Sequence, residues 1–143
     1  MNHINPSDEE IYKILSEAKT IAMVGASNNP EKTSHGIMKK LQSVGYRVIP
    51  VNPNETEVLG EKCYASLLDI PERIDIVDVF RRAETTTPLA REAVQINAKV
   101  FWLQLGIINE EAAEIAKQGG LTVVMDACIA VMHAILKVPD VQK

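Results

Sequence analysis

The chain has 143 residues, 46% of them hydrophobic and 24% charged, with a formal net charge of −4 at pH 7. This acidic balance argues against general binding to nucleic acid or anionic membranes, and no apolar run approaches the roughly 18 residues needed to span a membrane. The N-terminus lacks the pattern of an export or transit peptide, and the two cysteines have no metal-site spacing, so we expect one cytoplasmic domain over residues 1–143.

Two signals define the elements expected in the first half of the chain. Ser7 and Glu10 form a capping box, and Ser34 is a residue type that caps helices. Pro50 predicts that the second strand is interrupted near its end. In chain order we expect a helix over Ile11–Ala18, packed on the domain as part of residues 1–18, a strand over Thr20–Gly25, a helix from Ser34 to near Gly45, a strand over Tyr46–Val51 and a short helical turn over Tyr64–Leu68.

The second half continues the alternation of apolar runs and amphipathic segments. Pro88 suits the first position of a helix, Asn109 is followed by two glutamates that suit a helix N-terminus, and Gly119 is placed to end that helix. In chain order we expect a strand over Ile74–Phe80, a helix over Leu89–Ala98, a strand over Val100–Leu105, a helix after Asn109, a strand over Leu121–Met125 and a helix over Cys128–Lys137.

The five apolar runs are almost continuously hydrophobic, which is typical of parallel strands covered on both faces. Strands that alternate with helices form right-handed crossovers. The pattern therefore predicts an α/β fold, namely a doubly wound parallel five-stranded sheet with helices on both faces. Such sheets bind ligands beyond the carboxyl ends of their strands, at the switch point of the strand order.

The segment from Gly25 to Ser34 follows the first strand and is the strongest candidate for a ligand site. Gly25 permits a tight turn, and backbone N–H groups and hydroxyls at the start of the next helix can hold a phosphate, to which Lys32 adds positive charge. Such loops usually have about 2–6 residues, and longer ones tend to be functional. The alternative is a long polar loop that binds nothing.

This loop departs from the dinucleotide fingerprint. Ser27 and Pro30 stand where two of the three glycines are expected. The second strand ends in Asn52, where an NAD site favours an acidic residue for the ribose hydroxyls. Both departures disfavour NAD without excluding it, and they leave a multiply phosphorylated nucleotide as the favoured ligand.

Polar residues also follow the later strands. Arg81 and Arg82 come after the third strand, and because adjacent side chains alternate, we expect one of them to face the crevice and bind phosphate. The alternative is a solvated arginine pair with Glu84 as a partner. Gln104, with the region of Gly106, can contact an adenine edge or an amide.

The remaining polar candidates have simpler structural interpretations. Asp126 either caps the last helix or contacts the ligand. We interpret Trp102 and His133 as structural, and Cys128, which has no base nearby in sequence, as a buried inert thiol.

The ordered motifs resemble a known family. They are Gly25-Ala26-Ser27, Lys32-Thr33-Ser34-His35, Gly45 to Pro53, Val58 to Lys62, Asp75 to Arg82 and Phe101 to Gly106. From about Ser7 to about Cys128 the chain resembles the small bacterial CoA-binding proteins, and it is similar to the Rossmann-like CoA-binding part of succinyl-CoA synthetase alpha subunits. Many members have an arginine where this chain has Ala127, and an acidic residue where it has Met132.

The resemblance implies that CoA or acyl-CoA lies along the strand ends, with its phosphates near the Gly25–Ser34 loop. It favours Arg81 over Arg82 and makes Phe80 an apolar wall. The binding residues that it implies are Gly25, Ala26, Ser27, Lys32, Thr33, Ser34, Asn52, Phe80, Arg81, Gln104, Gly106 and Ile107.

No nucleophile paired with a base is evident in the sequence, so we expect a CoA-binding module without catalysis. The alternatives are an NAD(P)-linked reductase, a CoA-ligase subunit, or a protein–protein adaptor on a vestigial fold. A homodimer and an unidentified protein partner both stay open.

Overall fold

The computed structural model describes residues 2–141, and its centre is a five-stranded sheet of order β2-β1-β5-β6-β7. Every neighbouring pair in this sheet is parallel. The strands are β1 (Thr20–Val24), β2 (Arg47–Val51), β5 (Ile76–Val79), β6 (Val100–Leu103) and β7 (Thr122–Val124). Each lies within one of the five predicted apolar runs, so the predicted parallel five-stranded fold is confirmed.

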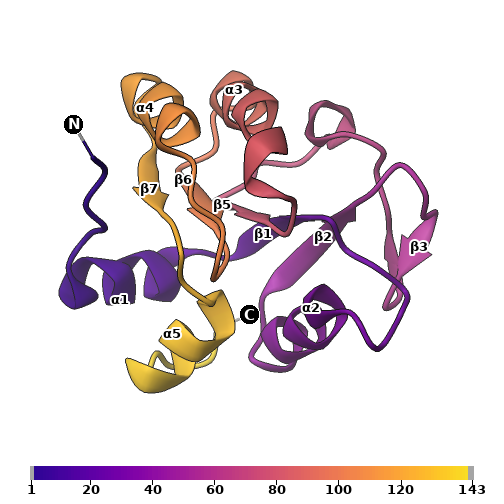
Figure 1. Cartoon of the computed structure of the whole chain (residues 1–143). Helices are drawn as coiled ribbons and strands as arrows, with labels where there is room; N and C mark the ends of the chain where they lie inside the picture. Colours follow the sequence, from indigo (N-terminus) through magenta and orange to yellow (C-terminus); the bar gives the residue numbers. More distant parts are fainter. Residues whose placement is uncertain (1, 142–143) are drawn as a thin grey trace.

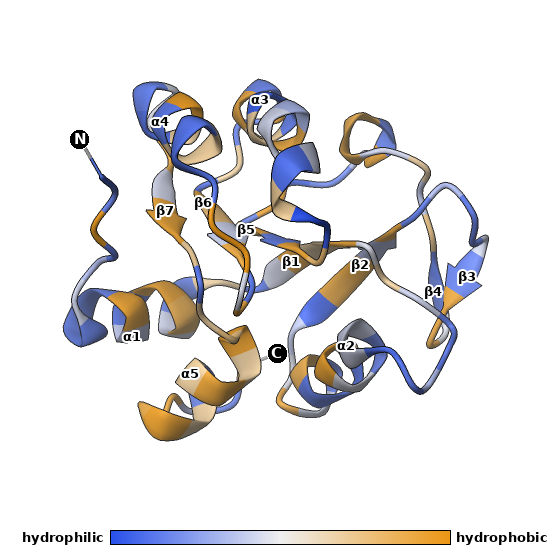
Figure 2. Cartoon of the chain, in the orientation of Figure 1, coloured by the Kyte–Doolittle hydropathy of each residue, from blue (hydrophilic) through white to orange (hydrophobic). Residues whose placement is uncertain are grey.

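Helices cover both faces of the sheet (Figure 1). One face carries α1 (Asp8–Glu17), α2 (Thr33–Ser43) and α5 (Ile129–Ile135), and the other carries α3 (Thr87–Gln95) and α4 (Glu110–Gln118). Because side chains alternate along a strand, each face has its own apolar cluster. Met23 and Trp102 belong to the cluster under α1, α2 and α5, whereas Ala22 and Phe101 belong to the cluster under α3 and α4. Polar and apolar residues alternate along α1, α2, α3 and α4, whereas α5 is mostly apolar and exposes Val131 and Ile135 (Figure 2).

The predicted helix starts at Ser7, Pro88 and Asn109 are confirmed, whereas the one at Ser34 is wrong. The Ser7 hydroxyl accepts a hydrogen bond from Glu10 N at 3.2 Å, and the Asn109 side chain accepts one from Ala112 N at 3.0 Å. Ser34, however, is not a cap: α2 begins at Thr33, Lys32 occupies the cap position, and Ser34 is buried within the first turn. The loop is therefore one residue shorter than expected.

Pro50 does not interrupt the second strand, because β2 continues through it to Val51. The strand lies at the edge of the sheet, where a missing backbone N–H is tolerated. The Pro50 carbonyl accepts a bond from Tyr64 N at 3.0 Å, and Val51 forms an isolated parallel bridge with Tyr64. Tyr64 therefore extends the sheet edge, and the predicted helical turn lies further along, as the short helix η1 (Leu67–Asp69).

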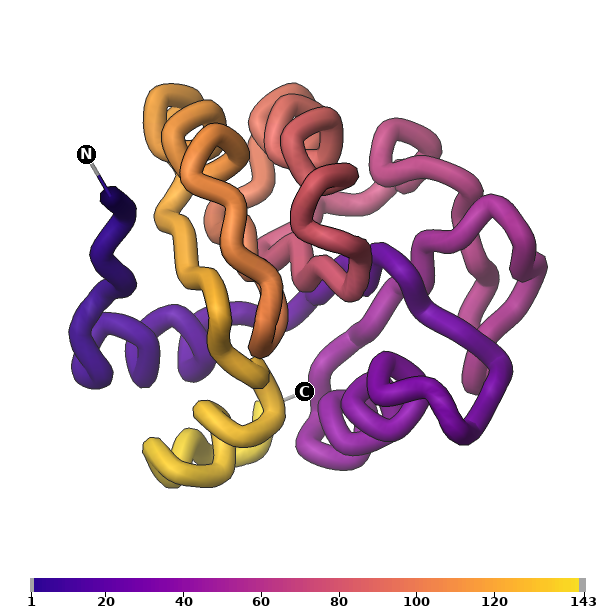
Figure 3. Tube along the Cα trace, viewed as in Figure 1, coloured from indigo at the N-terminus to yellow at the C-terminus, as the bar shows by residue number. Residues whose placement is uncertain are grey.

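The sequence pattern did not indicate the small hairpin of β3 (Glu57–Val58) and β4 (Glu61–Lys62) or the short helix η2 (Ala83–Thr85). The N-terminal segment runs beside β7 and α4 (Figure 3), where the Asn5 side chain bonds both the N–H and the carbonyl of Met125. Within residues 2–141, no helix is both long and apolar enough to cross a membrane.

Candidate functional site

The switch point of the strand order lies between β1 and β5. The chain passes from β1 to β2 on one side and then crosses to β5 on the other side of β1. Gly25 follows β1 with a φ of +93°, a conformation that glycine adopts without steric cost. A Cβ at this position would overlap the carbonyl oxygen of Phe80, the residue that follows β5. The two strand ends therefore approach so closely that only glycine fits at position 25.

The loop after Gly25 is held in place from two sides. His35, in the first turn of α2, donates from Nδ1 to the Ser27 carbonyl at 2.9 Å, and Asn52, at the end of β2, donates from Nδ2 to the Ala26 carbonyl at 2.7 Å. Asn28 bonds the hairpin segment through the Glu55 carboxylate and the Glu57 carbonyl. The loop is thus preorganised by side chains from α2, β2 and the hairpin.

Three cavities adjoin along the carboxyl ends of the strands, because Phe80 and Arg81 line all of them. We call them the loop cavity, the η1 cavity and the α5 cavity; their volumes are about 380, 580 and 690 Å³, within the usual range for ligand sites. The loop cavity is completed by Gly25, Ser27, Lys32, Thr33, Ser34 and Asn52. The η1 cavity is bounded mainly by Val24, Val51, Pro53, Leu67, Leu89 and Glu92. The α5 cavity is bounded mainly by Thr33, Ile37, Gln104, Gly106, Ile107 and Cys128.

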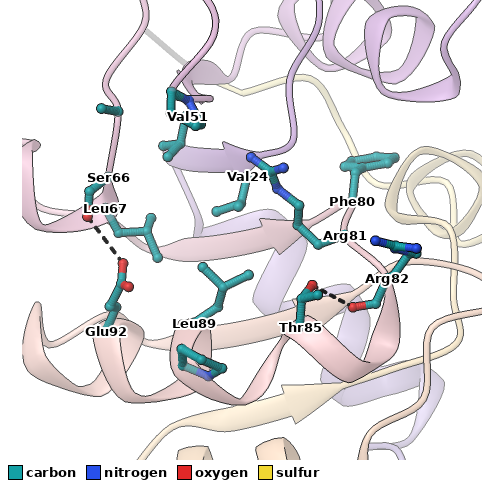
Figure 4. Close-up of a pocket in the computed structure, with 13 residues that line it drawn as sticks. Val24, Val51, Ser66, Leu67, Phe80, Arg81, Arg82, Thr85, Leu89 and Glu92 are labelled. Carbon is teal, nitrogen blue, oxygen red and sulfur yellow. Dashed lines mark hydrogen bonds between the residues drawn. The ribbon is translucent and has the colours of Figure 1, made fainter.

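The two adjacent arginines point in different directions (Figure 4). The Arg81 side chain extends toward Val24 and Val51, is half-buried, and makes no hydrogen bond or ion pair with any residue in 2–141. The Arg82 side chain is 85% exposed and lies 3.7 Å from a Glu84 carboxylate oxygen. Arg82 reaches the η1 and α5 cavities, but Arg81 lies where all three cavities meet.

Gln104 and Gly106 shape the wall of the α5 cavity. Gln104 is only 4% exposed, and its Oε1 accepts a bond from Ile129 N, at the start of α5, at 3.1 Å. Gly106 N donates to the Asp126 carboxylate at 2.8 Å. Asp126 thus fixes the loop after β6, whereas the cap position of α5 belongs to Cys128.

Eleven of the residues proposed from sequence line the loop or α5 cavity, but Ala26 lines none of the three. Ala26 is fully buried, and its carbonyl accepts a hydrogen bond from the Asn52 side chain. The η1 cavity was missed because Leu67 and Glu92 follow no strand. Cys128 was expected to be buried, yet it is only partly buried and lines the α5 cavity. The position of Cys128, two residues after Asp126 at the same sheet edge, could have indicated that it lies near the ligand site.

Three further buried residues with polar groups, Asp78, Trp102 and His133, line none of these cavities. Asp78, in the middle of β5, is fully buried without a hydrogen-bond partner in the described part of the chain, and this burial raises the pKa of its carboxyl well above the usual value. His133 packs edge-on against Tyr46, and burial lowers its pKa. Trp102 is buried as predicted and donates from Nε1 to the Ala127 carbonyl at 2.8 Å. Residues 2–141 contain no group of three or more His, Cys, Asp or Glu that could hold a metal ion.

Comparison with known proteins gives one family match and several relatives. A family model described as a CoA binding domain matches residues 19–134. The protein YneT of Bacillus subtilis (strain 168) is 50% identical over 133 residues, which cover 93% of this chain and 98% of YneT. The ADP-forming acetate–CoA ligase of Methanocaldococcus jannaschii is 28% identical over 129 residues, which cover 85% of this chain but only 18% of the ligase.

Solved structures agree with these matches. A protein from Pyrococcus horikoshii OT3 superposes with a TM-score of 0.90 at 42% identity, covering 96% of this chain and 99% of that one. The dinucleotide-forming acetyl-coenzyme A synthetase 1 of Ca. Korarchaeum cryptofilum superposes with a TM-score of 0.69 at 27% identity. That match covers 78% of this chain and 26% of the synthetase, so the likeness concerns one part of the larger protein.

Proposed function

The chain belongs to the CoA-binding domain family, and from this premise we propose that it binds CoA or acyl-CoA along the carboxyl ends of β1, β5 and β6 without catalysing a reaction of its own. The single observation that carries the proposal is the position of Arg81. A half-buried guanidinium without a partner among residues 2–141 lies where three cavities meet. Arginine binds phosphates bidentately and stays charged, so this position suits a pyrophosphate.

The three cavities differ in chemistry in a way that matches the parts of CoA. Hydroxyls and backbone N–H groups from Ser27 and Thr33, with the charge of Lys32, suit phosphates in the loop cavity. The apolar walls of the η1 cavity, such as Val51 and Leu67, suit a nucleobase. The α5 cavity, with the amide of Gln104, suits an arm that carries amide groups. CoA would therefore place its nucleoside toward Pro53 and its pantetheine arm toward α5.

Thermal unfolding with added ligand tests this function. A ligand present at about 100 times its Kd stabilises the folded state by roughly 2.7 kcal/mol, so CoA should raise the Tm in a concentration-dependent manner. NAD and NADP should raise it much less, because the loop lacks the dinucleotide fingerprint. A native mass spectrum of protein purified from cells should show retained CoA. Equal Tm shifts from NAD and CoA would contradict the proposal.

The second half of the proposal concerns catalysis. The Cys128 thiol has no hydrogen-bonded base among residues 2–141. The Ser66 hydroxyl donates to the Glu92 carboxylate at 3.3 Å in the η1 cavity, but no histidine of the described residues lines that cavity to complete a nucleophile–base arrangement. Purified protein should therefore neither hydrolyse acetyl-CoA nor form a CoA thioester from acetate, ATP and CoA. Steady release of free thiol from acetyl-CoA, abolished by Cys128→Ala or His133→Ala, would show an enzyme instead.

A further inference from the structure

The two cysteines of the chain lie in very different surroundings. Cys63 is buried, its thiol donates to the Asn52 carbonyl at 3.5 Å, and burial raises its pKa. Cys128 is only partly buried, its side chain makes no cap hydrogen bond, and it lines the α5 cavity together with Phe80 and Gln104. A thiol must be accessible to react, so only Cys128 is placed for chemistry with a ligand.

Gln104 supplies an independent indication that the α5 cavity holds a ligand. The residue is 96% buried (4% exposed), its Oε1 is occupied by Ile129 N, and its Nε2 makes no hydrogen bond within residues 2–141. Nε2 has no partner in this part of the chain but is not fully shielded from solvent. It therefore faces the α5 cavity, which Gln104 lines. Buried donors are almost always paired. A carbonyl oxygen on a ligand in the α5 cavity would accept a hydrogen bond from Nε2.

The pantetheine arm of CoA has the matching chemistry, since it carries amide carbonyls and ends in a thiol. The loop cavity and the α5 cavity share Thr33, Phe80 and Arg81. A pantetheine arm attached to phosphates in the loop cavity therefore enters the α5 cavity directly, passes Gln104, and brings its sulfur toward Cys128.

We propose that Cys128 forms a reversible mixed disulfide with CoA held in the α5 cavity, an inference that rests on the proposed CoA-binding function. The Cys128 thiolate attacks one sulfur of CoA disulfide, so that a Cys128–CoA disulfide forms and the second CoA leaves as a thiolate. The proton lost by Cys128 passes to the departing thiol through solvent. CoA disulfide is the oxidant, and a reducing thiol reverses the step, releasing CoA and restoring Cys128.

Binding should accelerate this exchange. A bound disulfide presents its sulfur at an effective concentration near the millimolar range, whereas the free reagent is present at about 10 μM in the assay. Cys128 should therefore react with CoA disulfide at least about tenfold faster than with 2-hydroxyethyl disulfide at equal concentration. Excess desulfo-CoA, which keeps the phosphates and arm but lacks the thiol, should remove this advantage.

The experiment follows the adduct on the full chain by intact mass under non-reducing conditions. The expected product has the combined mass of protein and CoA less two hydrogen atoms, maps to Cys128, and disappears with dithiothreitol. Cys63→Ser is the matched control and should keep the adduct, whereas Cys128→Ser and Cys128→Ala should lose it. Calorimetry with reduced CoA and a phosphine reductant measures non-covalent binding by the wild-type protein, separately from the adduct.

The two proposals fail in distinguishable ways. Tight calorimetric binding of reduced CoA, with Cys128 reacting no faster with CoA disulfide than with 2-hydroxyethyl disulfide, would overturn the disulfide and leave CoA binding intact. An adduct that maps to Cys63 would also overturn it. Absence of calorimetric binding by wild-type protein would remove the proposed function and this inference together.

Discussion

Gly25 and Phe80 approach each other so closely that the carbonyl oxygen of Phe80 occupies the space where a Cβ of residue 25 would lie. Gly25 N also donates to the Val51 carbonyl at 2.9 Å, and Phe80 N donates to the Val24 carbonyl at 2.8 Å. The ends of β1, β2 and β5 are therefore tied together at the point from which the three cavities open.

The first prediction follows from this contact. Gly25→Ala should destabilise the fold by about 2–4 kcal/mol, because a residue with a Cβ is strained at positive φ and the overlap also forces the backbone to shift. It should also weaken CoA binding, since the loop moves with the strand end. Denaturant unfolding and calorimetry measure the two effects.

Gly36→Ala is the matched control. Gly36 lies in α2, and a Cβ there would meet no atom within 4 Å. Alanine is the better helix former, so this variant should be more stable by about 0.5–1 kcal/mol. Equal losses from both alanines would show that the Gly25–Phe80 contact is unimportant.

A second prediction separates the two arginines. Arg81→Ala should weaken CoA binding roughly 10- to 100-fold, because a hydrogen bond to a charged group contributes about 1.5–3 kcal/mol. Arg82→Ala should change the affinity less than about twofold, since its side chain is 85% exposed and lies near Glu84. Isothermal calorimetry of both variants gives the comparison.

Dephospho-CoA identifies the phosphate involved. If Arg81 binds the pyrophosphate, Arg81→Ala should weaken CoA and dephospho-CoA by the same factor. If neither arginine variant loses more than twofold in affinity for CoA, the phosphates lie elsewhere and our placement of the ligand is wrong.

A third prediction concerns Asp126, which holds the loop after β6. Its carboxylate accepts the bond from Gly106 N, and its own φ is +57°. Asp126→Ala removes the acceptor and adds backbone strain, so it should lower the free energy of unfolding by about 1–2 kcal/mol and weaken CoA binding severalfold.

Asp126→Asn is the corresponding rescue variant. Asparagine keeps an acceptor oxygen and tolerates positive φ better than alanine. Stability and affinity should therefore stay near those of wild type. Identical behaviour of the alanine and asparagine variants would mean that Asp126 does not position the Gly106 loop.

A fourth prediction uses the buried carboxyl of Asp78, whose folded-state pKa is raised by burial. The unfolded chain loses this proton near pH 4, whereas the folded chain keeps it, so the folded state binds more protons above that pH. The free energy of unfolding should therefore fall as pH rises above about 4, by up to about 1.4 kcal/mol per pH unit, until the folded pKa is reached.

Urea unfolding at several pH values measures this slope. Asp78→Asn cannot ionise and should lack this component, so it should be more stable than wild type at neutral pH. Asp69→Asn changes an exposed carboxyl and should leave the slope unchanged. A slope that persists in Asp78→Asn would assign the pH dependence to other groups.

Local sequence patterns were sufficient to predict the strands of this protein and their arrangement in a sheet. Apolar runs such as Ile74–Phe80 need cover on both faces, and their alternation with helices leaves few arrangements other than a parallel sheet. The carboxyl-end rule then placed Gly25, Arg81 and Gln104 at one edge without further information. Ser7 was identified as a cap because capping depends on residues only three positions apart.

Other features depended on contacts between residues distant in sequence, so no local pattern contained them. Asn52 was predicted to face a ligand, but its amide also bonds the carbonyl of Ala26, which is 26 residues away. The η1 cavity exists because Leu67 and Glu92 come to lie on one side of it, facing the strand end that carries Arg81.

The sequence by itself determined the strands, their parallel arrangement and the edge of the sheet that carries the candidate binding residues. These features follow from the hydrophobic periodicity and the order of the elements along the chain. Only the tertiary structure decided that Arg81 has no partner among residues 2–141 while Arg82 lies near Glu84, and that Cys128 lines a cavity while Cys63 is buried. Residue type and spacing do not predict such differences, because the exposure and the partners of a side chain depend on which parts of the folded chain pack against it.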